Sequence, residues 1–125
     1  MEKLNFIKDQ MNAISVPYEF GEWTSEETYP YFVGEITEEP PAYESGLEQA
    51  TLILTGFHRG KYLTLEEMRE KIKKHFHPIC GLVGTTENGN AIAVFYEGAF
   101  YVPSGEADLK KIQINLKIKV WKGDL

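Results

Sequence analysis

The segment KKIQINLKIKVW, residues 110–121, decides the fold class because its apolar and polar side chains alternate without exception from Lys111 to Val120. The apolar set is Ile112, Ile114, Leu116, Ile118 and Val120. The opposite set is Lys111, Gln113, Asn115, Lys117, Lys119 and Trp121. A period of two predicts a β-strand with one buried and one solvent-exposed face. At about 3.3 Å per residue this strand spans on the order of 35 Å, which is long for a domain of 125 residues.

Trp121 departs from the polar character of the exposed set. Tryptophan is enriched at positions that become buried in protein interfaces, so Trp121 beside Lys119 indicates a contact surface. The alternative is that Trp121 packs against lysine side chains of its own subunit.

Two helices are predicted from apolar residues that recur at spacings of three and four. The first covers residues 2–14 and ends before Pro17, with an apolar stripe of Leu4, Ile7, Met11 and Ile14. The second is expected to begin at Thr64, because in TLEE the side chains of Thr64 and Glu67 fit a reciprocal capping box. Its apolar stripe is Leu65, Met68, Ile72 and Phe76.

The remaining apolar runs predict strands that are joined by tight turns. These strands are expected at residues 29–36, 48–58, 81–86, 91–96 and 99–102. Asn88–Gly89 and Glu97–Gly98 are the predicted turns, and TEEPPAYESG, residues 37–46, is a predicted long exposed loop. The element order predicts an α+β fold in one domain, residues 1–125. We expect a mainly antiparallel sheet of about four to six strands, with two helices packed on one face.

Charge is segregated along the chain. Ten acidic residues and no Lys or Arg lie between Lys8 and Arg59, whereas five lysines and one acid follow Leu109. The two halves either neutralise one another within one fold or let identical copies meet head to tail, which generates rings or helices. Candidate interface residues are Glu38, Glu39, Glu44, Lys111, Lys117, Lys119 and Trp121. Direct nucleic-acid binding is not expected because the acidic majority repels phosphates.

The hexapeptide HFHPIC, residues 75–80, contains two histidines and the only cysteine. It predicts a helix C-terminus, because histidine is favoured there and Pro78 stops the helix. His75 and His77 would then lie about 200° apart around the axis. A metal site and a Cys–His nucleophile pair are the alternatives. Cys80 is expected to be a small core residue entering a strand.

His58 and Arg59 lie between two glycines after a predicted strand, which favours a contact with an anion. The alternative is that Arg59 pairs with one of the many glutamates. An enzyme or small ligand- or metal-binding domain would use these two residues together with His75 and His77. No catalytic, cofactor or metal residues are predicted, because the carboxylates lack an opposed partner in a cleft. Aromatic residues, dense in YPYF and FYEGAFYV, are expected mainly in the core, with stacking on sugars or bases as the alternative.

No run approaches the roughly 18 apolar residues of a membrane span, and the start lacks the apolar core of a secretory signal. The chain is therefore expected in the cytosol where it is made, with no membrane partner.

The chain resembles the small tail-completion, tail-terminator or minor tail proteins of long-tailed bacteriophages and Gram-positive prophages. The resemblance is strongest in VPYEFGEWTSEETYPYFVGE, ATLILTGFHRG and AVFYEGAFYVPSGEADLKKIQINLKIKVW. It implies a non-enzymatic α+β virion component, made in the bacterial host cytoplasm, that forms a ring, commonly a hexamer. Its partners would be other copies and tail or connector proteins. A head–tail joining role is equally compatible, and no cofactor or active-site residues are implied.

Overall fold

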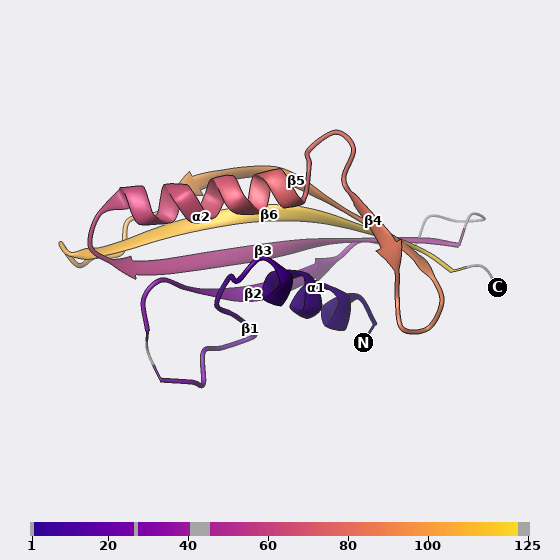
Figure 1. The fold of residues 1–125 in the computed structure, drawn as a ribbon, viewed down its shortest axis with the longest axis horizontal. Coiled ribbons are helices and arrows are strands. Elements are labelled where there is room, and N and C mark those ends of the chain that lie inside the picture. Colours follow the sequence, from indigo (N-terminus) through magenta and orange to yellow (C-terminus); the bar gives the residue numbers. More distant parts are fainter. Residues whose placement is uncertain (1, 27, 41–45, 123–125) are drawn as a thin grey trace.

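The computed structural model describes residues 2–26, 28–40 and 46–122 (Figure 1). Within these residues the chain forms two helices and one mixed, mostly antiparallel sheet with the strand order β1-β2-β3-β6-β5-β4. The elements are α1 (Glu2–Ala13), β1 (Tyr18–Phe20), β2 (Tyr31–Glu38), β3 (Leu47–Arg59), α2 (Tyr62–His75), β4 (Leu82–Thr85), β5 (Ala91–Tyr101) and β6 (Leu109–Trp121). The predicted α+β class is confirmed.

Strands β3 and β6 form the centre of the sheet. They pair antiparallel along their whole length, from Leu47 opposite Trp121 to Arg59 opposite Leu109. The alternation predicted for the last strand is confirmed, because every second residue of β6 from Ile112 to Val120 is buried. On β3 the same inner face carries Ala50, Leu52 and Leu54.

Both helices contribute to the core on this inner face. Ile7 and Met11 of α1 and Leu65 and Ile72 of α2 are fully buried in one cluster with the inner residues of the sheet. Phe76, directly after α2, is also fully buried. Figure 1 shows α2 lying along β5 and β6, with α1 near β1 and β2.

Helix α2 begins at Tyr62, so the predicted start at Thr64 is wrong. Lys61 occupies the N-cap position in an extended conformation and makes no side-chain capping bond, while the Thr64 amide donates to the Lys61 carbonyl. The helix is extended by contacts distant in sequence. The Tyr62 ring packs edge-on against Tyr101 at 4.9 Å, and the Lys110 ammonium lies 5.1 Å from the Tyr62 ring centre.

The predicted turn at Glu97–Gly98 is also wrong, because β5 is continuous from Ala91 to Tyr101. The register to β6 shifts between Tyr96 and Gly98, and Gly98 has a φ of 148°. A glycine in this conformation is typical of a bulge, and the sheet absorbs the extra residue there. The turn around Asn88–Gly89 is confirmed between β4 and β5, where the Gly89 amide donates to the Thr86 carbonyl.

The predicted loop 37–46 starts later than expected, whereas β3 begins at Leu47, directly after the predicted end of the loop. Thr37 and Glu38 continue β2 opposite Thr51 and Ala50. Residues 41–45 lie outside the described residues. The parallel strand β1 beside β2 was not predicted.

Candidate interface on the open sheet face

The outer face of the sheet lies opposite the core, and neither helix covers it. Antiparallel sheets often leave one face in water, and such faces are usually polar. This one carries several apolar side chains. By strand register they include Tyr31, Val33, Ile53, Phe57, Val83, Phe95, Phe100 and Trp121. The expectation that most aromatics fill the core therefore holds for Phe32 and Tyr96 and is wrong for these rings.

An aromatic ladder crosses this face at one end of β2, β3 and β6. It consists of Trp23, Tyr31, Phe57 and Lys111, with ring centres 4.7 Å apart for Trp23–Tyr31 and 5.1 Å apart for Tyr31–Phe57. The Lys111 ammonium lies 5.6 Å from the Phe57 ring centre. Tyr31, Phe57 and Lys111 are direct cross-strand neighbours, so the pleat itself stacks them. Beside the ladder lies a hollow of about 360 Å³.

The opposite end of the face carries a second group, which we name the Trp121 corner: Leu47, Val83, Phe95, Lys119 and Trp121. Trp121 is 39% exposed and Val83 is 70% exposed. The Lys119 ammonium lies 5.5 Å from the Phe95 ring centre. Within the described residues neither Lys119 nor Lys111 forms an ion pair. The side assigned to both lysines and Trp121 from the alternation is confirmed.

The acidic interface candidates are partly engaged within one subunit. Glu38 accepts a hydrogen bond from Lys3 at 2.8 Å, which lowers the pKa of the Glu38 carboxyl. Glu39 pairs with Lys117. Glu44 lies outside the described residues. At Glu38 and Glu39 the charges are neutralised within the fold, and among the described candidates Lys111 and Lys119 have no ion-pair partner.

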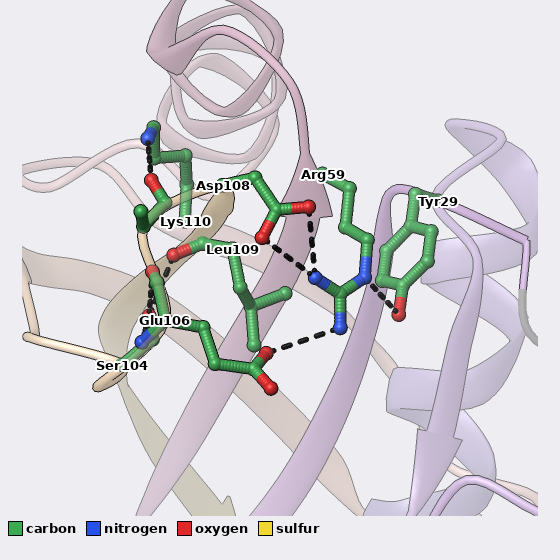
Figure 2. A network of polar contacts seen from close by, with 8 residues as sticks. Tyr29, Arg59, Ser104, Glu106, Asp108, Leu109 and Lys110 are labelled. Atoms are coloured by element: carbon green, nitrogen blue, oxygen red, sulfur yellow. Dashed lines mark hydrogen bonds and ion pairs between the residues drawn. The ribbon is translucent and has the colours of Figure 1, made fainter.

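Arg59 follows the alternative interpretation and pairs with acidic side chains. Figure 2 shows its guanidinium between Tyr29 and the loop before β6, where it donates to Asp108 at 3.0 Å and Glu106 at 3.1 Å. The Tyr29 hydroxyl 3.3 Å from Nε is the largest cause of a raised Arg59 pKa, followed by the two carboxylates. His58 points to the other side of β3, and its Nδ1 is buried without a hydrogen-bond partner in the described chain. The two residues therefore do not converge on one site.

The histidines of HFHPIC form a helix end, as predicted. His75 is the last residue of α2, and its Nε2 lies 2.8 Å from Gln10 Oε1 of α1. His77 Nδ1 accepts hydrogen bonds from the amides of Ile79 and Cys80, both at 3.1 Å. The expectation that Cys80 is a core residue is wrong, because this turn presents it to solvent.

Among the described residues no group of three or more His, Cys, Asp or Glu side chains could hold a metal ion. The described chain also contains no helix long and apolar enough to cross a membrane. No protein-family model matches the chain, and no curated protein is significantly similar to it.

A hollow between α1 and β1 could not be found from the sequence, because it depends on the unpredicted strand. We name it the Phe20 hollow. It measures about 450 Å³ and is lined by Leu4, Asn5, Lys8, Tyr18, Glu19, Phe20, Glu22 and Thr24. Phe20 is 44% exposed, whereas the Tyr18 hydroxyl is buried without a partner in the described chain. This burial raises the Tyr18 pKa to about 12. The apolar residues at alternate positions after Pro17 were the available signal.

The rim of the Phe20 hollow is predicted to loosen in acid. Hydrogen bonds from Ser25 and Thr24 hold the pKa of Glu19 at about 2, below its ordinary value of 4.5. Because the folded-state pKa is depressed, the Glu19 carboxylate stabilises the fold above pH 4.5, and this contribution disappears as the pH falls towards 2. We expect Glu19→Gln to unfold at lower urea concentration than the wild type near neutral pH, with the two curves converging near pH 2. A constant difference across this range would contradict the assignment.

Proposed function

We propose that this protein is a non-enzymatic structural component of a long-tailed bacteriophage or prophage. It acts in tail completion or head–tail joining by assembling into a ring, such as a hexamer, and by contacting neighbouring tail or connector proteins in the virion. The observation that supports self-association most directly is the Trp121 corner on an outer face without a helix. The sequence resemblance supports the viral context.

The composition of the outer face favours a protein partner. Exposed apolar groups that are rimmed by polar residues are typical of interaction surfaces, and Trp is among the residues that most often dominate interface energies. Lys111 and Lys119 lie on the same face and form no ion pair with the described residues, while the protein carries a net charge of −6. Copies can therefore attract one another through complementary regions despite their overall repulsion.

The enzyme and metal-binding alternative gains no support from the geometry of its named residues. His58 and Arg59 lie on opposite sides of β3, and Arg59 is engaged by Glu106 and Asp108. His75 contacts Gln10, and His77 accepts hydrogen bonds from backbone amides. Each of these side chains has a structural role or is separated from the others.

Sedimentation velocity should detect self-association that rises with protein concentration and weakens with added salt, because exposed ion pairs are screened. Trp121→Ala should weaken association roughly 30-fold, the equivalent of about 2 kcal/mol for a central aromatic contact. Electron microscopy of the assembled fraction should show closed rings.

Leu63→Ala is the matched control, because Leu63 is 63% exposed at the start of α2 and belongs to none of the three named surfaces. It should assemble as the wild type does. A wild-type chain that remains monomeric at high concentration and low salt would contradict self-association. A Trp121→Ala variant that assembles normally would exclude the Trp121 corner.

A further inference from the structure

We infer that copies of this chain join head to tail, with the Trp121 corner of one copy inserted into the Phe20 hollow of the next. The inference rests on the proposed self-association and specifies its two surfaces. It commits to a second copy as the occupant of the hollow, on the basis of the size and apolar lining of the hollow and of complementary charge.

The hollow offers an apolar surface of suitable size for an indole ring. Its volume is about 450 Å³, and its apolar lining comes from Leu4 of α1 and from Tyr18 and Phe20 of β1. Two aromatic rings in contact gain energy beyond the apolar area that they bury. The Tyr18 hydroxyl is buried over Gly34 of β2 and takes no part in this contact.

The charges around the two surfaces are also complementary. Glu22 lines the hollow, is exposed, and has no ion-pair partner among the described residues. Glu19 and Glu22 outweigh Lys8, so the hollow is net negative. Lys119 lies two positions from Trp121 on the same side of β6 and is unpaired within the described chain. Docking of Trp121 would bring the Lys119 ammonium towards these carboxylates.

The other hollows fit Trp121 and Lys119 less well in aromatic lining or in charge. The hollow beside the aromatic ladder contains Lys111, and its rings already stack on one another. A hollow along α2 contains no Phe, Tyr or Trp, and its three lysines, Lys71, Lys73 and Lys74, outnumber its two glutamates. The hollows at the other end of the sheet are lined mainly by charged side chains and contain no aromatic ring. Their lining residues include Lys3, Glu38 and Glu48.

The placement of the two surfaces favours head-to-tail assembly over a symmetric dimer. Trp121 lies on the outer face at the end of a central strand, whereas the Phe20 hollow lies beside α1 at the β1 edge of the sheet. A contact between two different patches leaves one of each unused in every dimer. Addition therefore continues until the assembly closes into a ring or grows as a helix.

A mixing experiment tests this pairing. Trp121→Ala removes the inserted side chain and keeps the hollow, while Phe20→Ala damages the hollow and keeps Trp121. Each variant alone should associate at least about 30-fold more weakly than the wild type. An equimolar mixture should form heterodimers and nothing larger, because one intact contact exists between the two variants and both unused surfaces are defective. Circular dichroism and thermal unfolding verify that both variants are folded.

A charge exchange provides an independent readout. Lys119→Glu and Glu22→Lys should each weaken association, and the double variant in one chain should recover it. Wild-type assembly combined with a mixture that stays monomeric, or that forms large oligomers, would overturn the pairing and leave the proposed function intact. A monomeric wild type would overturn both. Heterodimers in the mixture, together with recovered association of the double variant, would establish the contact.

Discussion

Replacement of Phe76 by alanine is expected to lower the free energy of unfolding by about 3–5 kcal/mol, the usual cost of removing a buried aromatic ring. Phe76 is fully buried directly after α2, and its carbonyl accepts a hydrogen bond from the Tyr96 amide of β5. The substitution leaves that backbone bond possible and opens a cavity where the helix meets the sheet. At roughly 4 °C per kcal/mol for a chain of this size, the melting temperature should fall by about 12–20 °C.

His77→Ala, one residue further along, is the matched control for Phe76→Ala. Its exposed imidazole accepts hydrogen bonds from two backbone amides, so the expected loss in the free energy of unfolding is about 1 kcal/mol. Chemical denaturation of both variants distinguishes the two effects. Equal losses would mean that Phe76 is not the side chain that joins α2 to the core.

The second large effect is predicted on β6. Ile114→Ala should cost about 2–5 kcal/mol, because Ile114 is fully buried at the centre of the sheet between Leu54 and Ala99. Gln113→Ala, on the outer face one residue earlier, should change stability by less than about 1 kcal/mol. Urea unfolding midpoints provide the comparison.

If Gln113→Ala destabilised the chain as strongly as Ile114→Ala, the outer face would be buried in the isolated subunit. That outcome would also remove the main support for the proposed self-association. The pair of variants therefore tests the fold and the availability of the outer face together.

The central strands were predictable because burial of one face imposes a period of two on the sequence. Ile112 to Val120 could alternate with polar residues only in such a strand, and the structure confirms their side assignment. The end of α2 was predictable for a similarly local reason, since Phe76 continues the helical stripe and Pro78 follows it.

Other features depended on contacts between distant residues. Sequence alone could not show that Tyr62 packs on Tyr101 and starts α2 early, or that Gly98 forms a bulge in a continuous strand instead of a turn. Cys80 was predicted to lie in the core because its neighbour Ile79 is apolar. The His77 ring holds that segment in an outward turn, and Ile79 is itself exposed.

The candidate surfaces also include one part that the sequence predicts and others that it does not. Lys119 and Trp121 could be placed on the exposed side of β6 from alternation alone. The Phe20 hollow requires α1 to approach a three-residue strand paired to β2. The aromatic ladder likewise requires Trp23, from the loop after β1, to stack on Tyr31 of β2. No periodicity encodes either arrangement.

The pairing of β3 with β6 has a consequence for how the chain matures on the ribosome. Leu47 lies opposite Trp121 in the register, so the pairing of the two central strands cannot be completed until residue 121 has left the exit tunnel. Until then β3 is not paired with β6. Contacts between residues so far apart in sequence also form slowly. Nascent chains in which β6 has not yet emerged should therefore expose the apolar side of β3 to holding chaperones.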